Sequence, residues 1–220
     1  MFISVHTQDL LLYLPAGLAA PLLLFCLYRA QWPSLFQSNA RVHLAAGSCL
    51  SLGLLWKMLA LNINDIFLLS LNFVVSLSLI FGFFFTIIIG AISLCFLHLI
   101  SPLPWENIAF HFLINVTVPA SVATLSLVIL ERTAAKNLFL YTLGLGFIGA
   151  MAASLASGLS SLAILYSLNS TLFWPTWDHA QYFFLLAFPQ GFCNGMLISA
   201  LAIWQPELLK TFDEKRWFGH

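Results

Sequence analysis

Charge is scarce in this chain of 220 residues, since only 7% of its residues are Asp, Glu, Lys or Arg, against about 25% in an ordinary soluble domain. Eight basic residues balance eight acidic ones, so the formal net charge is zero. The sequence therefore has no basic footprint for nucleic acid. Apolar residues make up 61% of the chain. This composition predicts one integral membrane domain, residues 1–205, followed by an amphipathic tail, residues 206–220.

Several catalytic motifs are also absent. The chain has no GxxxxGK[ST] loop, which excludes ATP hydrolysis by the chain itself, and no HExxH zinc-protease helix. Gly158-Leu-Ser-Ser161 is similar to an intramembrane serine nucleophile region, but no histidine lies at membrane depth on the last helix to act as its base. We therefore expect no enzymatic activity and no tightly bound cofactor.

Cysteine pairs with metal-binding spacing and a basic signal-peptide region are missing too. The four cysteines lie in apolar stretches without CxxC spacing, which favours simple packing over a thiolate metal site. Residues 1–9 lack a basic stretch, so we expect the first apolar helix to be retained.

Long apolar runs dominate what remains. A helix needs about 20 apolar residues to cross a bilayer, and by that measure the chain is an all-α bundle of seven spans. They are Leu10–Tyr28, Val42–Asn62, Asp65–Phe81, Phe83–Ile100, Trp105–Leu130, Leu138–Leu168 and Gln181–Trp204. The third and fourth come from one run that is too long for a single span, and Gly82 is the breaker near its middle.

Basic residues orient this bundle, because loops that stay in the cytoplasm are enriched in Lys and Arg. With seven spans, the basic residues of the loops and the tail fall on one side: Arg29, Arg41, Arg132, Lys136, Lys210, Lys215 and Arg216. The pattern predicts an N-terminus outside and a C-terminus in the cytoplasm, with Lys57 as the exception inside a span. The tail then lies at the cytoplasmic interface, anchored by Trp217 and Phe218.

The sixth span carries two ladders of small residues at four-residue spacing: Gly146, Ala150, Ser154 and Gly158, and beside them Gly149, Ala153, Ser157 and Ser161. Small residues let helix backbones approach closely, so we expect this helix at the centre of the bundle. A docking surface for another membrane subunit is the alternative.

Amide side chains inside the spans mark a candidate binding site, because a polar face in lipid is costly unless it meets protein, water or a ligand. Gln190 and Asn194 share one face of the last span, and His111 and Asn115 share one face of the fifth. With Asn72 of the third span, they are expected to line one outward-opening cavity. The alternative is that these side chains form hydrogen bonds between helices and pair the backbone groups that a proline leaves without a helical partner.

Histidines gather on the predicted outer side of the bundle. Imidazole suits divalent transition metals, so His6, His98, His111 and His179 are candidate metal ligands near the mouth of the cavity. The alternative is that they are solvated residues of the membrane interface.

Four stretches carry a family resemblance: Leu79-Ile-Phe-Gly82, Asn137-Leu-Phe-Leu-Tyr141, Leu185-Leu-Ala-Phe-Pro-Gln-Gly-Phe-Cys-Asn-Gly-Met196, and Ile203-Trp-Gln-Pro running into Thr211-Phe-Asp213. In this order the chain resembles the CbiM/NikM-type membrane component of energy-coupling-factor (ECF) cobalt and nickel transporters, and more closely a divergent bacterial branch of it.

The resemblance implies a seven-helix, substrate-binding permease subunit in a bacterial inner membrane, with Co²⁺ or Ni²⁺ as the transported ligand. It also implies a membrane coupling subunit and cytoplasmic ATPase subunits as partners, besides membrane lipid. In that family the metal site uses the terminal amine, a histidine at position two and an inner histidine. Here these positions hold Phe2 and Ser70, and Gln190 replaces the acid usual in the last-helix motif. The alternative function is a non-transporting membrane scaffold that kept the fold and lost the metal site.

Overall fold

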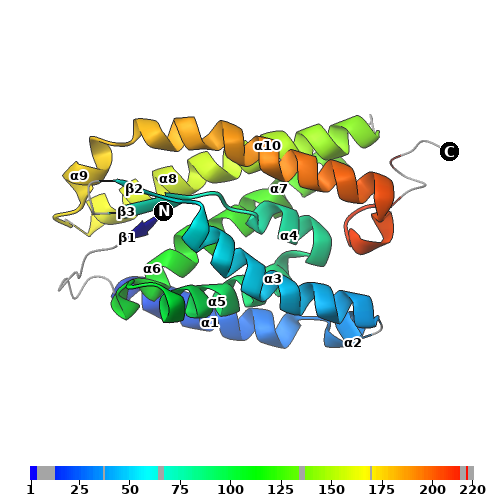
Figure 1. Ribbon diagram of the computed structural model, residues 1–220, viewed down its shortest axis with the longest axis horizontal. Coiled ribbons are helices and arrows are strands. Elements are labelled where there is room, and N and C mark those ends of the chain that lie inside the picture. The colour runs from blue at the N-terminus through cyan, green and yellow to red at the C-terminus, as the bar shows by residue number, and fades with distance from the viewer. Residues whose placement is uncertain are drawn as a thin grey trace.

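Helices account for most of the structure, a computed structural model that describes residues 1–3, 13–36, 38–63, 67–133, 137–168, 170–213 and 217. The long helices run along one common direction, and a small sheet lies near one end of the bundle (Figure 1). The α-helices are α1 (Tyr13–Arg29), α2 (Trp32–Phe36), α3 (Asn39–Met58), α4 (Val74–Phe81), α5 (Phe83–Ile100), α6 (Ile108–Phe112), α7 (Val118–Glu131), α8 (Ala150–Ser167), α9 (Phe173–Trp177) and α10 (Gln181–Trp204). Short 3-10 turns, η2 (Trp105–Asn107) and η5 (Pro206–Leu208), and π-helical segments, η3 (Leu113–Thr117) and η4 (Leu140–Gly149), complete the helical part.

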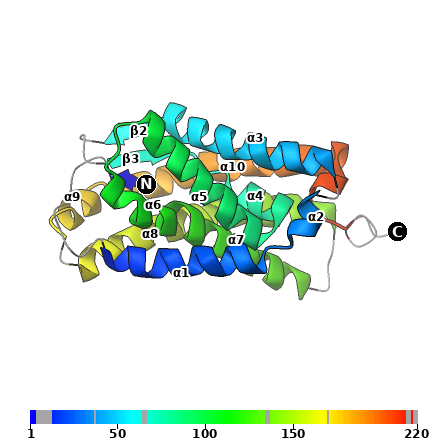
Figure 2. The same cartoon turned by 90° about the horizontal axis from the view of Figure 1, so that it is seen from below.

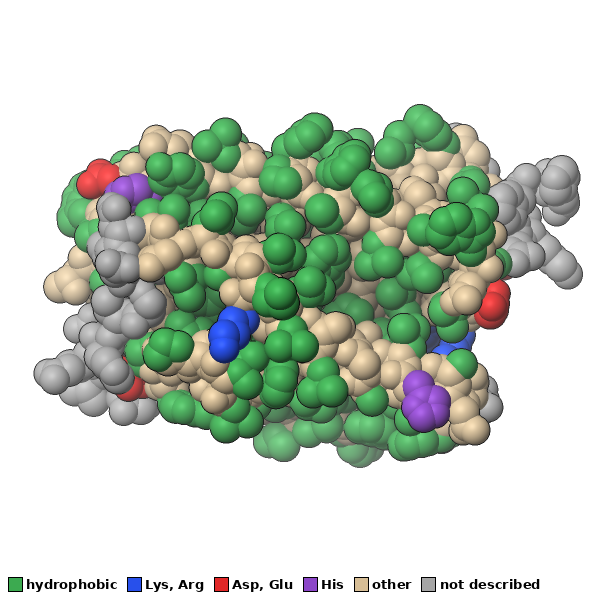
Figure 3. All heavy atoms as spheres, in the orientation of Figure 1, with side chains coloured by type: hydrophobic (Ala, Val, Ile, Leu, Met, Phe, Trp, Pro, Cys, Tyr) green, Lys and Arg blue, Asp and Glu red, His purple; other side chains and the backbone are tan. Residues whose placement is uncertain are grey.

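Four helical stretches are long and apolar enough to cross a membrane: Phe83–Ile100, Trp105–Glu131, Leu140–Ser167 and Gln181–Trp204. They correspond to the fourth to seventh predicted spans and indicate a membrane protein. Figure 3 shows hydrophobic side chains along the whole length of the face in view. Leu18, Phe188 and Ile203 are among the large apolar side chains that are more than half exposed, as expected of surfaces that face lipid.

The third predicted span, Asp65–Phe81, is wrong as a continuous helix. Residues Phe67–Ser70 form strand β3, and within the described part of this range, from residue 67 on, only the eight residues of α4 are helical. At about 1.5 Å per residue, α4 is far shorter than a bilayer core. The second prediction, Val42–Asn62, also ends early, because α3 stops at Met58 and strand β2 (Ala60–Ile63) follows.

A three-stranded antiparallel sheet corrects the all-α prediction. Strand β3 lies in the middle, in the order β1-β3-β2, between β1 (Phe2–Ile3) and β2. Leu68 of β3 lies opposite Phe2 of β1 on one side and opposite Asn62 of β2 on the other. The sheet carries the first residues of the chain into the helical bundle, where Phe2 and Ile3 are buried. It thereby positions the candidate site described below.

Gly82 confirms the predicted break between the third and fourth segments. Its φ of 81° lies in the left-handed region that favours glycine, and it separates α4 from α5. The last carbonyls of α4 have no helical donor after this break. They accept hydrogen bonds from the tail instead: Lys210 N–H to Ile80 O at 3.0 Å, and Thr211 N–H and Oγ1 to Leu79 O at 3.3 and 2.9 Å.

The tail therefore packs against the bundle through Leu209 and Trp217, while Glu207 and Lys210 stay exposed, which corrects the prediction that Trp217 anchors a helix at the membrane interface. Trp217 is 1% exposed and packs on Tyr141 with ring centroids 5.2 Å apart. Phe218 lies outside the described residues. Tyr141 also hydrogen-bonds to Thr211 through its hydroxyl group, at 2.7 Å.

The small-residue ladders of the sixth span lie inside the chain. All eight of their residues are buried, and α10 packs along η4 and α8. A Cβ at Gly146 would lie 3.1 Å from the Cα of Gly195, and one at Gly158 would lie 2.6 Å from the ring of Phe183. The ladders are thus used for packing within the chain, so these faces do not supply an external docking surface.

Candidate functional site

The amino group of Met1 lies in the interior of the bundle, held by one side chain. Met1 donates from its amine to Asn115 Oδ1, and Asn115 Nδ2 donates back to the carbonyl of Met1 at 2.7 Å. The fit is reciprocal, because an amide offers both an acceptor and a donor. Asn115, predicted from its place in the fifth span, therefore binds the first residue of the chain.

The rest of β1 is held by the same stretch of helix. Ile3 N–H donates to His111 Nε2 at 2.8 Å, and Asn107 Nδ2 donates to Ile3 O at 3.4 Å. The ring of Phe2 packs edge-on against Trp56 and His111, at centroid distances of 5.5 and 5.2 Å. His111 thus positions the strand that carries the amine.

A proline explains why one backbone carbonyl of this helix is free to accept a hydrogen bond from a side chain. Pro119 has no N–H, so the carbonyl four residues earlier, that of Asn115, loses its helical donor. Asn72 supplies the missing donor, with Nδ2 2.7 Å from Asn115 O. The surrounding segment, η3, is π-helical, a distortion that occurs frequently at functional sites.

Amide hydrogen bonds extend from Asn72 to the last helix. Asn194 Nδ2 donates to Asn72 O at 2.8 Å and to Gln190 O at 2.9 Å, while its Oδ1 accepts from the N–H and Oγ of Ser76 at 3.2 and 2.6 Å. Asn72, Asn115, Gln190 and Asn194 are at most 7% exposed. The structure therefore brings four of the five predicted binding residues into one buried cluster, with His111 one turn from Asn115.

A small cavity lies beside the Met1 amine. Its volume is about 20 Å³, which is enough for one water molecule or one bare ion. It is lined by Met1, Leu69, Ser70, Asn72, Asn115, Ser154, Ser157, Gly158, Phe183, Leu186 and Gln190. Asn194 and His111 do not line it.

Three of the polar side chains around the cavity have no hydrogen-bond partner within the described part of the protein. They are the amide of Gln190 and the hydroxyls of Ser70 and Ser154, and all three residues are at most 8% exposed. In the described part of the protein, the side-chain atoms that are both fully buried and unpaired are Trp56 Nε1 and Thr117 Oγ1, so the polar atoms of Gln190, Ser70 and Ser154 reach the free space of the cavity. Their arrangement around one cavity therefore marks a place for a polar or ionic occupant.

Burial also changes the chemistry of the amine. Loss of solvation lowers the pKa of the Met1 amino group from 8.0 to about 5. At neutral pH the amine is then uncharged and has a lone pair, so it can act as a ligand to a cation.

The predicted histidine cluster forms only in part. His111 Nδ1 and His98 Nε2 are 3.3 Å apart, and His98 Nδ1 is 2.9 Å from Leu94 O. Because Ile3 N–H occupies His111 Nε2, the proton of neutral His111 lies on Nδ1 and is donated to His98. All ring nitrogens of this pair therefore have protein partners.

His179 lies apart from that pair. It stacks on Tyr182 at a centroid distance of 5.9 Å, with its Nδ1 2.8 Å from Pro175 O, and His6 lies outside the described residues. Among the residues that the structure describes, no group of three His, Cys, Asp or Glu side chains could hold a metal ion. The four candidate metal ligands are therefore not gathered in one place.

Sequence reasoning missed several lining residues. The Met1 amine was found only through the family resemblance, which also pointed to position 70. Ser154 and Ser157 were interpreted as packing residues of the small ladders, although both line the cavity. Serine at a small-residue position is a signal that could have identified them.

Comparison with protein-family models, with curated proteins and with solved structures finds no match for this chain.

Proposed function

We propose that this chain is the substrate-binding, multi-pass component of an ECF-type transporter in a bacterial inner membrane, and that its substrate occupies the cavity beside the Met1 amine. The observation that carries the proposal is the set of three polar side chains that line this cavity and make no hydrogen bond within the described part of the protein. An occupant of the cavity can complete their hydrogen bonds or coordination, at about 0.5–1.5 kcal/mol for each bond.

The size and the donors of the cavity define the class of substrate. A space of about 20 Å³ excludes an organic solute and accepts a single dehydrated ion. The lining offers the nitrogen lone pair of Met1 together with amide and hydroxyl oxygens. Nitrogen donors favour late divalent transition metals over Mg²⁺ or Ca²⁺, so Co²⁺ and Ni²⁺ are the substrates to test first.

The family resemblance gives separate support. It marks positions 1, 70 and 190 as the places of the amine, the inner histidine and the acid of the last-helix motif. Met1, Ser70 and Gln190 all line the one cavity. Position 2, held here by Phe2, does not line it.

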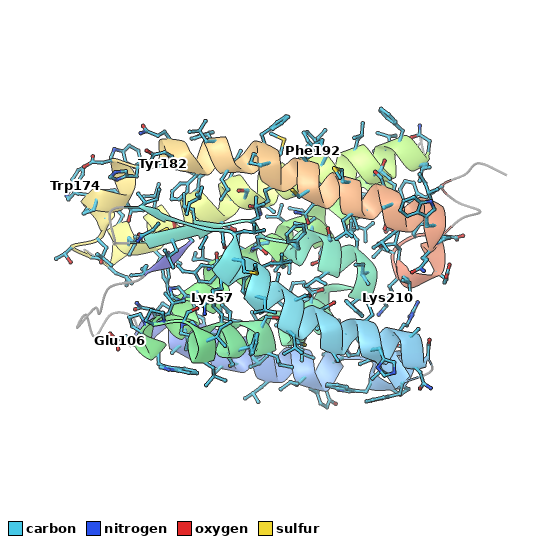
Figure 4. All side chains as sticks on the ribbon, in the orientation of Figure 1. Lys57, Glu106, Trp174, Tyr182, Phe192 and Lys210 are labelled. Atoms are coloured by element: carbon cyan, nitrogen blue, oxygen red, sulfur yellow. The ribbon has the colours of Figure 1, made fainter. Side chains whose placement is uncertain are left out.

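The proposed topology keeps seven membrane segments, with β3 and α4 together forming the third, and an outer N-terminus. Lys210 lies at the end of the bundle near α2 and the tail (Figure 4). Arg29 is the last residue of α1, and Arg41, in the first turn of α3, donates from Nη2 to Glu207 O at 3.0 Å. Lys57 is at the other end of α3 (Figure 4) and donates to Ile100 O at 2.6 Å, which caps α5. The exception to the charge pattern thus has a structural role.

A membrane scaffold is the second candidate, and the chemistry of the lining favours it. Among the described residues around the cavity, none is a carboxylate or a histidine, so a divalent ion would lack a counter-charge. A single buried water would satisfy the same groups. In that case the cavity is a structural feature and no ion is transported.

Isothermal titration calorimetry of the purified full chain with Co²⁺ and Ni²⁺ separates the two candidates. We expect binding at tens of micromolar or tighter, weakened about tenfold or more in Gln190→Met, because that variant removes a coordinating oxygen. His179→Ala is the matched control, because this residue lies away from the cavity, and it should bind like wild type. No heat of binding in wild type with either ion contradicts the transport proposal.

Co-purification tests the partners. A transporter component should bring ATPase subunits and a second membrane protein with it. Recovery of other proteins without an ATPase favours the scaffold.

A further inference from the structure

A second cavity, unrelated to the Met1 site, lies where α1 ends and α5 begins. Its volume is about 530 Å³, and it is lined by Tyr28, Arg29, Gln31, Phe81, Gly82, Phe83, Phe84, Phe85 and Lys210. Figures 1 and 2 both place α2 and the tail at this end of the bundle. The proposed transport function uses none of these residues.

Two cations face this cavity from different parts of the chain. Arg29 is the last residue of α1, and Lys210 comes from the tail. Among the described residues of the lining, none is acidic. The cavity is therefore a basic site, and its complement is an anion.

The fold holds Lys210 over the break between α4 and α5. Its backbone N–H is bonded to Ile80 O at 3.0 Å, and a Cβ at Gly82 would lie 3.4 Å from its Cδ and 3.6 Å from its Nζ. The lysine side chain therefore lies within van der Waals distance of position 82. The first residues of α5, Phe83 to Phe85, line the same space, so the N-terminus of this helix adds to its attraction for an anion.

Next to the basic site is an apolar surface. The ring of Phe84 packs edge-on against Phe25 of α1, with centroids 6.1 Å apart, and Phe25 is 53% exposed. Phe83 in turn packs edge-on against Phe84 at 5.7 Å. The site is thus amphipathic, with cations in the cavity and aromatic rings on the adjoining face.

We propose that this cavity binds the phosphate-bearing headgroup of an anionic phospholipid, with the phosphate between Arg29 and Lys210 and an acyl chain along Phe84 and Phe25. Phosphate is the shared chemistry of a lipid headgroup and of free phosphate, but only the lipid uses the adjoining aromatic surface. Basic pockets between membrane helices are known to take anionic headgroups.

Native mass spectrometry of the full chain in detergent measures this preference, with phosphatidylglycerol and phosphatidylcholine as probes and inorganic phosphate as a separate arm. Each basic residue near an anionic headgroup strengthens binding about fivefold. We therefore expect phosphatidylglycerol to bind about 30-fold tighter than phosphatidylcholine, with a loss of about fivefold in Arg29→Gln or Lys210→Gln and of the whole preference in the double variant. Arg132→Gln, a basic residue outside the cavity lining, is the matched control and should keep the preference.

The alternative outcomes are distinct. Equal binding of the two lipids, or a preference that survives the double variant, overturns the proposal. Competition by millimolar inorganic phosphate as effective as that by the lipid overturns the lipid source, because the aromatic surface would then contribute nothing. Because both cations are exposed, the variants should unfold at the same temperature as wild type, and the single variants still test the site if the double variant does not fold.

Discussion

Two amides on one face of α10 should respond to substitution with opposite signs. Gln190 and Asn194 are four residues apart and almost equally buried, at 3% and 0% exposure. The amide of Gln190 has no partner within the described part of the protein, whereas that of Asn194 makes four hydrogen bonds. We predict that Gln190→Met stabilises the protein and that Asn194→Leu destabilises it.

The magnitudes follow from these contacts. Gln190→Met keeps the length of the side chain and removes an amide that borders the cavity and makes no hydrogen bond within the described part of the protein, so we expect a gain of up to about 1 kcal/mol. Asn194→Leu removes four hydrogen bonds worth about 0.5–1.5 kcal/mol each. It also leaves the carbonyl of Asn72 and the hydroxyl of Ser76 without their partners. We expect a loss of about 2–6 kcal/mol.

Unfolding in mixed micelles, with dodecyl sulfate as the denaturant and helical circular dichroism as the signal, measures both changes. The same Gln190→Met sample should bind Co²⁺ and Ni²⁺ more weakly, so stability and ligand binding would change in opposite directions. If Gln190→Met destabilises the protein as much as Asn194→Leu does, the Gln190 amide has a structural partner. The reasoning from unpartnered groups would then be refuted.

Three further predictions concern other parts of the fold. When strand β1 leaves the bundle, its Met1 amine is solvated and takes up a proton below pH 8, whereas the buried amine stays neutral to about pH 5. The free energy that holds the strand in the bundle should therefore fall by about 4 kcal/mol in total as the pH drops through this window. Amide hydrogen exchange in the strand should become faster over the same range. In Gly90→Ala the new Cβ would lie 2.8 Å from Cγ2 of Val116, which should cost about 1–3 kcal/mol of unfolding free energy, measured in the same micelle titration. Tyr141→Phe removes the hydroxyl bonded to the tail at 2.7 Å, which should cost about 0.5–1.5 kcal/mol and increase quenching of Trp217 fluorescence by a soluble quencher.

Each of these predictions has its own control. Acetylation of the Met1 amine removes the titrating group, so the pH dependence should disappear; if it persists, another group is responsible. A Cβ at Gly47 would have no neighbour within 4 Å, so Gly47→Ala should stabilise α3 by up to about 1 kcal/mol. The unfolding free energy lost in Gly90→Ala should be regained when Val116→Ala is added. Tyr166→Phe changes an exposed tyrosine and should leave the fluorescence of Trp217 unchanged.

The helices that the sequence predicts best are those bounded by clear breakers. Phe83–Ile100 and Gln181–Trp204 have the predicted limits, because Gly82 begins the first and Pro206 follows the second. Hydropathy failed at Phe67–Ser70, where a short apolar run is compatible with either a strand or a helix. The pairing partners that decide between them, residues 2–3 and 60–63, lie elsewhere in the chain.

The sequence predicts those residues of the candidate site whose polar side chains are energetically costly to place in lipid. Asn72, Asn115 and Gln190 stood out as amides inside apolar segments, and the cavity lies among them. The Met1 amine could not be found in this way, because a terminal amino group is not a residue type and its burial depends on the sheet. Helix rotation, which turned His111 toward β1 and away from the cavity, is likewise not determined by hydropathy.

The bond between the tail and α4 also concerns the order in which the protein is made. Thr211 caps a carbonyl 132 residues earlier in the chain, so α4 is synthesised long before the group that completes it. Until then the last carbonyls of α4 need a temporary partner, such as water. The end of α4 is thus fixed only when synthesis has passed Thr211.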